Sequence, residues 1–227
     1  MSKASLSYIA KYIKDNLQLI SDRGWEKLYG NLGGIASHRG TLGQLLYGAK
    51  MPFLQDLGYV PYTGFYGCEL KSIVLPSNCN EIKNLAFSVC EQLESVTIKG
   101  EILSVGASLF SYSGIKEFPF TDDNFKCNRL PNMCFKDCQR LDQVVIPHEV
   151  NAIGDSCFDG CISLTEIYLP KSVGIIHMFA FENCPKLSTI YYGGNASDWR
   201  RIMKHSCWYD GQELTIKCMD DTIIERI

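Results

Sequence analysis

The sequence predicts a right-handed solenoid of α/β-type repeats with one short parallel β-sheet, preceded by a small helical module over residues 1–56. Three observations lead to this fold class. Phenylalanines recur at intervals of 22 to 25 residues, a short aliphatic segment follows each of them, and the first 56 residues lack both features. A period of this length is the signature of a protein built from stacked repeats.

The repeats cover residues 57–192 and align in six copies. Three residues after each phenylalanine stands a cysteine, replaced once by serine, and an L-x-x-I-x-L segment comes next. Five residues before each phenylalanine stands an aliphatic residue. The aligned phenylalanines are Phe65, Phe87, Phe110, Phe135, Phe158 and Phe181, and the residues that follow them are Cys68, Cys90, Ser113, Cys138, Cys161 and Cys184.

Each repeat contains one strand and one turn. The I-x-L part alternates in the manner of a half-buried strand, whereas the x-x-A-F-x-x-C part is long enough only for a single turn. One such unit cannot bury its own apolar side, so neighbouring units must stack. Successive rungs of a parallel stack lie about 4.8 Å apart, which places each Leu, Ile, Phe and Cys against its copy in the next repeat.

The pattern, as in "IGDSCFDGCISLTEIYLPKSV", resembles the BspA-type (Treponema pallidum-type) leucine-rich repeat. The resemblance implies a leucine-rich-repeat solenoid that binds or attaches to proteins. The segment "IYYGGNASDWRRI", together with Trp208 and "LTIKCMDD", resembles the ending of that family and predicts a C-terminal cap over residues 193–227. Repeats one and three are each a residue short before Leu70 and Ile115. Repeat three also expands at "FPFTDDNFKCN", where we expect a bulge or a small loop.

The first 56 residues predict a helical cap or a docking module. Apolar residues spaced by three and four, among them Leu6, Ile9, Ile13 and Leu17, indicate an amphipathic helix. Such a module can cover the exposed apolar end of a solenoid, or it can dock onto another subunit of an assembly, and the two roles are compatible.

Composition and charge exclude several classes of function. The net charge of −3 predicts no binding to nucleic acid or to an anionic membrane. No stretch approaches the roughly 18 apolar residues of a membrane span. The N-terminal "MSKASLSYIAKYIKDNLQLI" lacks the apolar run of a signal peptide, so we expect the eleven cysteines to stay reduced.

The cysteines and histidines predict packing rather than chemistry. Two C-x₃-C pairs, at Cys134 and Cys138 and at Cys157 and Cys161, fall on repeat positions that core packing explains. His205 precedes Cys207 by two residues, a spacing that a catalytic dyad could use, but no orienting carboxylate or oxyanion donor accompanies it. We therefore predict no enzyme activity, no metal and no cofactor.

The candidate binding residues lie on the outer face of the predicted sheet. Residues between the Ile and the Leu of each strand point away from the core, and this row becomes aromatic toward the C-terminus. We expect a contact patch with Trp199 beside it. Its residues are Tyr168, Tyr191, Glu166, Val145 and Gln143. Alternatively, tyrosine stands there for strand propensity alone.

Together these observations predict a non-catalytic interaction protein with one or more protein partners. The first hypothesis is a subunit of a larger assembly, such as a virion or tail protein of a bacteriophage, docked through residues 1–56; an oligomer is also allowed. The alternative is an adhesin-like surface or intracellular binder that holds its ligand on the sheet face. The expected location is the virion or otherwise the cytoplasm.

Overall fold

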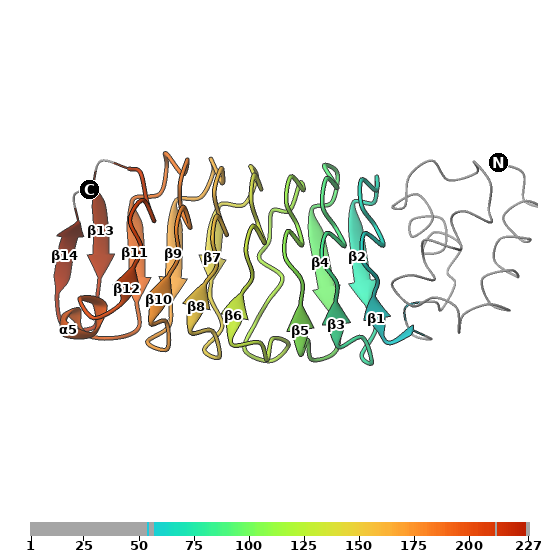
Figure 1. The fold of residues 1–227 in the computed structure, drawn as a ribbon, viewed down its shortest axis with the longest axis horizontal. Coiled ribbons are helices and arrows are strands. Elements are labelled where there is room, and N and C mark those ends of the chain that lie inside the picture. The colour runs from blue at the N-terminus through green and yellow to red at the C-terminus, as the bar shows by residue number, and fades with distance from the viewer. Residues whose placement is uncertain (1–53, 55–56, 212, 226–227) are drawn as a thin grey trace, which may run out of the picture.

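A computed structural model describes residues 54, 57–211 and 213–225. Within these residues the chain winds into a solenoid whose strands follow one another from one end to the other (Figure 1). The right-handed repeat solenoid predicted from the sequence is confirmed. The predicted docking helix, with Leu6, Ile9, Ile13 and Leu17, lies outside the described residues.

The L-x-x-I-x-L segments form the first ladder of parallel strands. Burial alternates along them, with the pattern exposed, buried, exposed, buried in β2, because every second side chain points into the core. Neighbouring strands pair in register, so that Tyr168 of β9 lies opposite Tyr191 of β11. The strands are β2 (Ser72–Leu75), β4 (Ser95–Ile98), β7 (Gln143–Val145), β9 (Glu166–Leu169), β11 (Thr189–Tyr192) and β13 (Leu214–Lys217).

A second ladder of two-residue strands contains the aliphatic residues five places before each phenylalanine. The sequence predicted one sheet, whereas the described residues form four, because this second ladder exists and both ladders are interrupted at repeat three. The strands of the second ladder are β1 (Tyr59–Val60), β3 (Glu81–Ile82), β5 (Ser104–Val105), β6 (Arg129–Leu130), β8 (Ala152–Ile153), β10 (Ile175–Ile176) and β12 (Met203–Lys204).

The turns form a third, continuous side of the solenoid. The Phe65 amide donates to the carbonyl of Ala86 in the next turn at 2.8 Å, and the Phe158 amide donates to the carbonyl of Ala180 in the same way. Most turns place two residues in the left-handed region, four positions apart, which tightens the chain around the phenylalanine. These residues include Leu85 and Val89, Ser108 and Tyr112, Met133 and Asp137, Ser156 and Gly160, and Phe179 and Asn183.

The six aligned phenylalanines form a continuous stack in the core. Their ring centroids are 5.3 to 5.5 Å apart, and the planes of successive rings differ by at most 23°. All six side chains are fully buried. The predicted packing of each phenylalanine against its copy one repeat away is therefore confirmed.

Repeat three breaks the regular pattern, and the prediction of a strand in it is wrong. Residues 114–120 form no strand, since Pro119 has no amide hydrogen to donate to a ladder. Pro119 is buried rather than facing outward. The expanded segment folds inward, where Phe120 contacts Phe125 at 4.4 Å between ring centroids and Phe118 contacts Phe135 at 5.1 Å. An aromatic cluster thus fills the space left by the missing strand.

The segment predicted as the C-terminal cap extends both ladders before it closes them. β12 and β13 pair in parallel with β10 and β11, and a short helix, α5 (Ala196–Trp199), connects the two ladders (Figure 1). β14 (Thr222–Glu225) then pairs antiparallel with β13. The end of the sheet is therefore a reversed strand rather than another parallel rung.

Candidate binding groove on the sheet face

A row of side chains crosses the outer face of the five-stranded sheet. We call Val145, Tyr168, Tyr191 and Lys217 the tyrosine row, one residue from each of β7, β9, β11 and β13. The Tyr168 and Tyr191 rings stack with centroids 4.5 Å apart and planes 7° from parallel. The Lys217 ammonium lies 4.8 Å from the centroid of the Tyr191 ring. The parallel register produces this order, because it brings equivalent positions of successive repeats side by side.

Polar neighbours fix the hydroxyl end of Tyr191. Its hydroxyl donates to Glu166 Oε1 at 3.4 Å and accepts from Lys217 Nζ at 3.3 Å. Gln143 lies opposite Glu166 in the register of β7 and β9, and its side chain is exposed. All five sheet-face residues selected from the sequence therefore lie together on this surface.

The tyrosine row forms one wall of a groove of about 350 Å³. The rest of the lining is largely apolar and comes from the segments that follow the strands, including Pro170, Gly193 and Met219. His148 contributes a polar edge, held by the Asp122 carboxylate at 2.7 Å. The groove therefore joins exposed ring edges and apolar walls to a few hydrogen-bonding groups, the usual composition of a recognition site.

Partial burial and charge act on Tyr168. Desolvation on the sheet surface, and secondly the nearby Glu166 carboxylate, raise the pKa of Tyr168 above its ordinary value. Tyr168 is 39% exposed, and Val145, at the same position of β7, is 61% exposed, so the aromatic stack ends at Val145.

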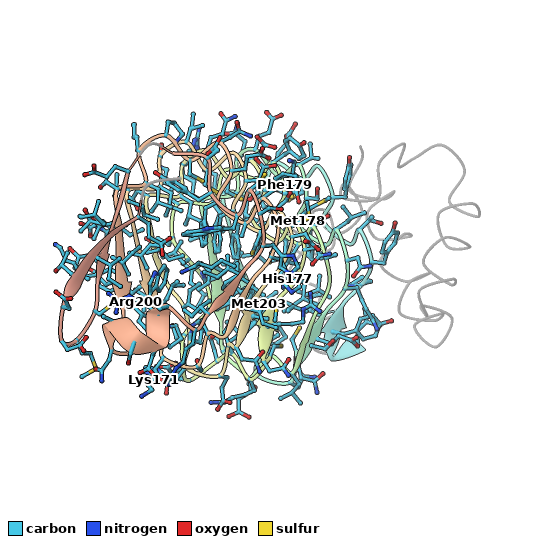
Figure 2. The ribbon with its side chains drawn as sticks, turned by 60° about the vertical axis from the view of Figure 1, so that its left-hand side comes forward. Lys171, His177, Met178, Phe179, Arg200 and Met203 are labelled. Atoms are coloured by element: carbon cyan, nitrogen blue, oxygen red, sulfur yellow. The ribbon has the colours of Figure 1, made fainter. Side chains whose placement is uncertain are left out.

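Trp199 does not lie beside this patch, contrary to the expectation from sequence. It is fully buried in the cap, where its ring centroid lies 5.4 Å from that of Tyr192. Its indole Nε1 donates to Glu225 Oε1 at 2.6 Å, and Lys204 Nζ donates to the same oxygen at 2.9 Å. Figure 2 shows Arg200 and Lys171 at this cap end of the molecule. Trp199 is thus a core residue of the cap.

The repeat cysteines are buried and hydrogen-bonded. Nine of the eleven cysteines are buried, and all eleven are free thiols. The Cys161 thiol donates to the Phe135 carbonyl of the preceding turn at 3.1 Å, and Cys184 donates to the Phe158 carbonyl at the same distance. Burial raises the pKa of these thiols. They therefore act as packed donors inside the stack, in agreement with the packing interpretation of the C-x₃-C pairs.

His177, His205 and Cys207 lie around the second ladder and the cap. His177 and His205 stack with ring centroids 5.2 Å apart, and His177 Nδ1 lies 3.9 Å from Asp155 Oδ1. Figure 2 shows His177 with Met178 and Phe179 in the turn that follows β10. Cys207 is exposed. Among the described residues, no group of three or more His, Cys, Asp or Glu side chains is placed to hold a metal ion.

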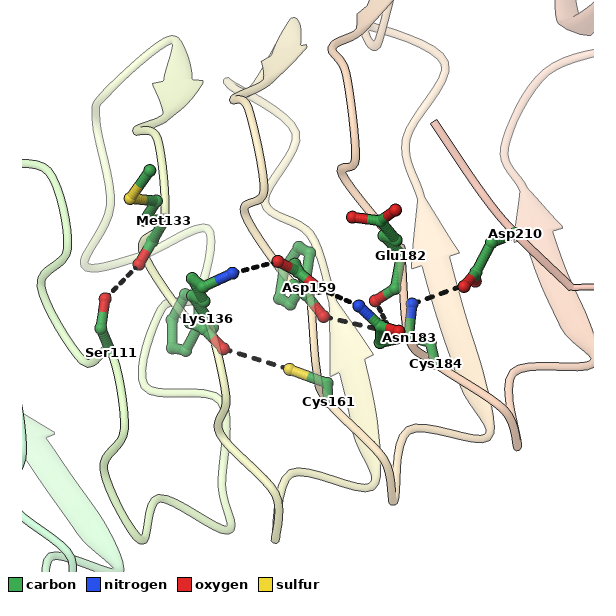
Figure 3. A network of polar contacts seen from close by, with 11 residues as sticks. Ser111, Met133, Lys136, Asp159, Cys161, Glu182, Asn183, Cys184 and Asp210 are labelled. Atoms are coloured by element: carbon green, nitrogen blue, oxygen red, sulfur yellow. Dashed lines mark hydrogen bonds and ion pairs between the residues drawn. The ribbon is translucent and has the colours of Figure 1, made fainter. Parts of the chain in front are cut away.

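A chain of polar contacts joins the turns from repeat three to the cap (Figure 3). Lys136 pairs with the buried Asp159 carboxylate, and Asn183 Nδ2 donates to Asp159 Oδ1 at 2.9 Å. The backbone amide of Asn183 donates to Asp210 Oδ1 at 3.0 Å. Ser111 Oγ, one turn earlier, donates to the Met133 carbonyl at 2.6 Å. These contacts hold successive turns together and leave the tyrosine row on a different side.

Sequence reasoning missed two groups that shape the groove. Lys217 occupies the position of Tyr168 and Tyr191 in the next strand, and "LTIKC" contains the signal, since Lys217 follows Ile216 as Tyr191 follows Ile190. His148 carried no such signal, because its position depends on Asp122 in the irregular loop of repeat three.

In the described part of the chain, no helix is long and apolar enough to cross a membrane.

Comparison with known proteins gives a family match and several structural likenesses. The family model "BspA type Leucine rich repeat region (6 copies)" matches residues 50–141 and 128–215. A comparison with curated protein sequences found no match. The crystal structure of a leucine-rich cell surface protein from Faecalibacterium prausnitzii is 30% identical, with a TM-score of 0.56, over 61% of this chain and 36% of that one.

A second structure, the pneumococcal vaccine antigen PcpA, is 14% identical with a TM-score of 0.51, over 74% of this chain and 44% of that one. At that identity the likeness concerns the fold alone. This chain spans less than half the length of either of these two proteins.

Proposed function

Because the chain belongs to the BspA-type leucine-rich-repeat family, we propose that it is a non-catalytic interaction protein that binds a protein partner through the groove beside the tyrosine row. The single observation that carries this proposal is the stacked pair of the exposed Tyr168 and the half-buried Tyr191, which adjoins a groove of about 350 Å³. Tyrosine is among the residues that contribute most to protein interfaces.

The groove suits a peptide segment of a partner. It adjoins four neighbouring strands, so it extends for about 14 Å at the spacing of parallel strands, which matches roughly four extended residues. Its walls accept apolar side chains, while the Tyr191 hydroxyl, Lys217 and Glu166 offer donors and acceptors at one side. Because the backbone below is fixed by the parallel ladder, little order would have to be created on binding.

The test is a selection of random peptides on the immobilised full chain, followed by fluorescence polarisation with the enriched peptides. We expect the double variant Tyr168→Ala/Tyr191→Ala to weaken their binding at least tenfold, because interface tyrosines contribute roughly 2 kcal/mol when truncated. Tyr66→Ala is the matched control, since Tyr66 is an exposed tyrosine in the turn of repeat one. Peptides that bind the double variant as tightly as the unchanged protein would rule the groove out.

The role of residues 1–56 in an assembly stays a prediction, because the docking residues lie outside the described part of the chain. Neither of the two structures compared above is described as a virion protein, and one is described as a cell surface protein. The proposal therefore rests on the sheet face and gives no preference to the virion.

A further inference from the structure

A second recess opens in the solenoid at repeat three, away from the tyrosine row. Most repeats have two residues between the cysteine and the next aliphatic residue, as between Cys90 and Leu93, whereas repeat three has only Gly114 between Ser113 and Ile115. The short loop lies between full-length loops of repeats two and four. The missing residue leaves a notch of about 300 Å³.

We call this recess the repeat-three notch. Six of the residues that line it carry the argument, and they come from the short loop and from the loops and turns beside it: Glu91, Tyr112, Gly114, Asp137, Gln139 and Arg140. Repeat one is also a residue short, but within the described residues a full-length loop lies on only one side of it. Within the described residues, repeat three therefore combines a short loop with a full-length loop on each side.

The floor of the notch is fixed by close backbone packing. The Gly114 amide donates to the Cys90 carbonyl at 3.0 Å, and a β-carbon at Gly114 would lie 2.1 Å from the Glu91 carbonyl oxygen. Ser113 is 4% exposed beside it, with its hydroxyl 3.6 Å from the Cys138 sulfur. Because only glycine fits there, the notch is set by the backbone and not by the positions of mobile side chains.

The walls present polar groups that the protein itself does not use. The side chains of Glu91, Tyr112, Asp137 and Gln139 make no hydrogen bond or ion pair with another residue of the described chain. Arg140 reaches Glu94 at 3.5 Å through one nitrogen, and Glu94 is shared with Lys116 at 2.9 Å. The other guanidinium donors of Arg140 therefore remain for a ligand.

These groups define the chemistry of the ligand. Two carboxylates only accept hydrogen bonds, a guanidinium only donates them, and an amide does both. A ligand whose groups both donate and accept can satisfy all of them, and a hydroxyl is such a group. Anions would be repelled by Glu91 and Asp137, whereas a simple cation would leave Arg140 unmatched. The Tyr112 ring, with 51% of that residue exposed, adds an apolar surface for the CH groups of a flat ring.

We propose that the repeat-three notch binds one neutral hexopyranose unit of a saccharide. The recess is at the small end of the roughly 300–1,000 Å³ that small-molecule sites occupy, a size that suits a single sugar ring. In this arrangement the ring stacks on Tyr112, and its hydroxyls bond to Glu91, Asp137, Gln139 and Arg140. The site is independent of the peptide groove, so either can bind its ligand without the other.

The experiment is saturation-transfer NMR on the full chain with methyl glycosides of glucose, galactose, mannose and N-acetylglucosamine in the millimolar range. We expect at least one of these probes to bind, and its affinity to fall at least tenfold in Tyr112→Ala and in Gln139→Ala. Tyr66→Ala, which removes an exposed tyrosine outside the notch, should bind as the unchanged protein does. Circular dichroism checks that each variant is folded.

A third variant inserts one serine between Ser113 and Gly114, which restores the regular loop length and should abolish binding in a folded protein. If that variant does not fold, the two substitutions decide the result. Absence of binding by every neutral glycoside overturns the proposal, as does equal binding by Tyr112→Ala. Binding of methylguanidinium or acetate without any glycoside also overturns it, because it assigns the notch to a charged ligand.

Discussion

At the scale of single residues, the repeat cysteine is a hydrogen-bond donor as well as a small apolar side chain. The Cys138 thiol donates to the Phe110 carbonyl of the preceding turn at 3.1 Å, and Cys161 and Cys184 repeat this contact along the stack. Ser113 stands at the same position in repeat three, where a hydroxyl replaces the thiol. The position therefore requires a small side chain with one hydrogen to donate, and cysteine meets this need while remaining largely apolar.

The buried thiols predict a loss of stability at alkaline pH. Burial raises the pKa of Cys138 and of Cys184 to about 12, whereas an ordinary thiol has a value of 9.0. The folded state therefore keeps protons that the unfolded chain releases. The stabilisation from each such protonated thiol is fully present below pH 9. It is lost as the pH rises toward 12, at about 1.4 kcal/mol per pH unit.

The measurement is the free energy of unfolding in urea at several values between pH 8 and pH 11. Cys138→Ser is the informative variant, because Ser113 shows that a hydroxyl fits the ladder and a serine does not titrate in this range. We expect its pH slope to be shallower by about 1.4 kcal/mol per pH unit. A slope equal to that of the unchanged protein would contradict the prediction.

At the scale of elements, the turns determine the path of the chain. Each turn contains left-handed residues that permit its sharp reversals, and several of them are not glycine. Val89 has φ of 61° although it is β-branched, a combination with a steric cost of roughly 1–2 kcal/mol. The corresponding residue of repeat five is Gly160, at φ of 76°.

Val89→Gly should therefore stabilise the protein, by about 0.5–1 kcal/mol after the greater backbone entropy of glycine is subtracted. Val74→Gly is the matched control, since Val74 lies in β2, where glycine weakens a strand and should lower stability. Both are measured as changes in the urea midpoint with the slope unchanged. A Val89→Gly variant that unfolds at lower urea than the unchanged protein would show that Val89 is not strained.

The elements also show which parts of the fold could be predicted from the sequence. The phenylalanine position recurs in every copy, and the cysteine and L-x-x-I-x-L positions recur in most copies, so the burial of most of these residues followed from stacking. The second ladder could not be predicted from the sequence, because strands of two residues have too few positions for an alternating pattern. The strand predicted for repeat three does not form, because Pro119 has no amide hydrogen to donate to a ladder. The repeat-three notch could be recognised only in the structure, because it depends on how three neighbouring loops differ in length.

At the scale of the whole molecule, each repeat contacts mainly its neighbours, so stability is a sum of unit and interface terms. Repeat three is the place where both strand ladders are interrupted. Hydrogen bonds between turns nevertheless continue across it, as from the Phe110 amide to the Cys134 carbonyl at 2.8 Å. The end of the molecule is held separately, by the Glu225 carboxylate that binds both Trp199 and Lys204.

Glu225 should therefore be a strong contributor to the stability of the cap. Glu225→Ala leaves the buried indole hydrogen of Trp199 without an acceptor, which costs roughly 1–3 kcal/mol. Glu225→Gln keeps an acceptor and should lose less. Urea unfolding followed by circular dichroism measures both variants, and equal stability of Glu225→Ala and the unchanged protein would show that this carboxylate contributes nothing to the cap.

The reversal of β14 ends the parallel pairing within the described residues. A parallel rung at that end would offer another molecule the same pairing that joins β9 to β11, and head-to-tail contacts that do not close into a ring grow into filaments. β14 is four residues long and runs against β13, so its free edge does not match the parallel rungs of a second copy. The repeated pairing that builds the core therefore stops at β13, one strand before the described chain ends.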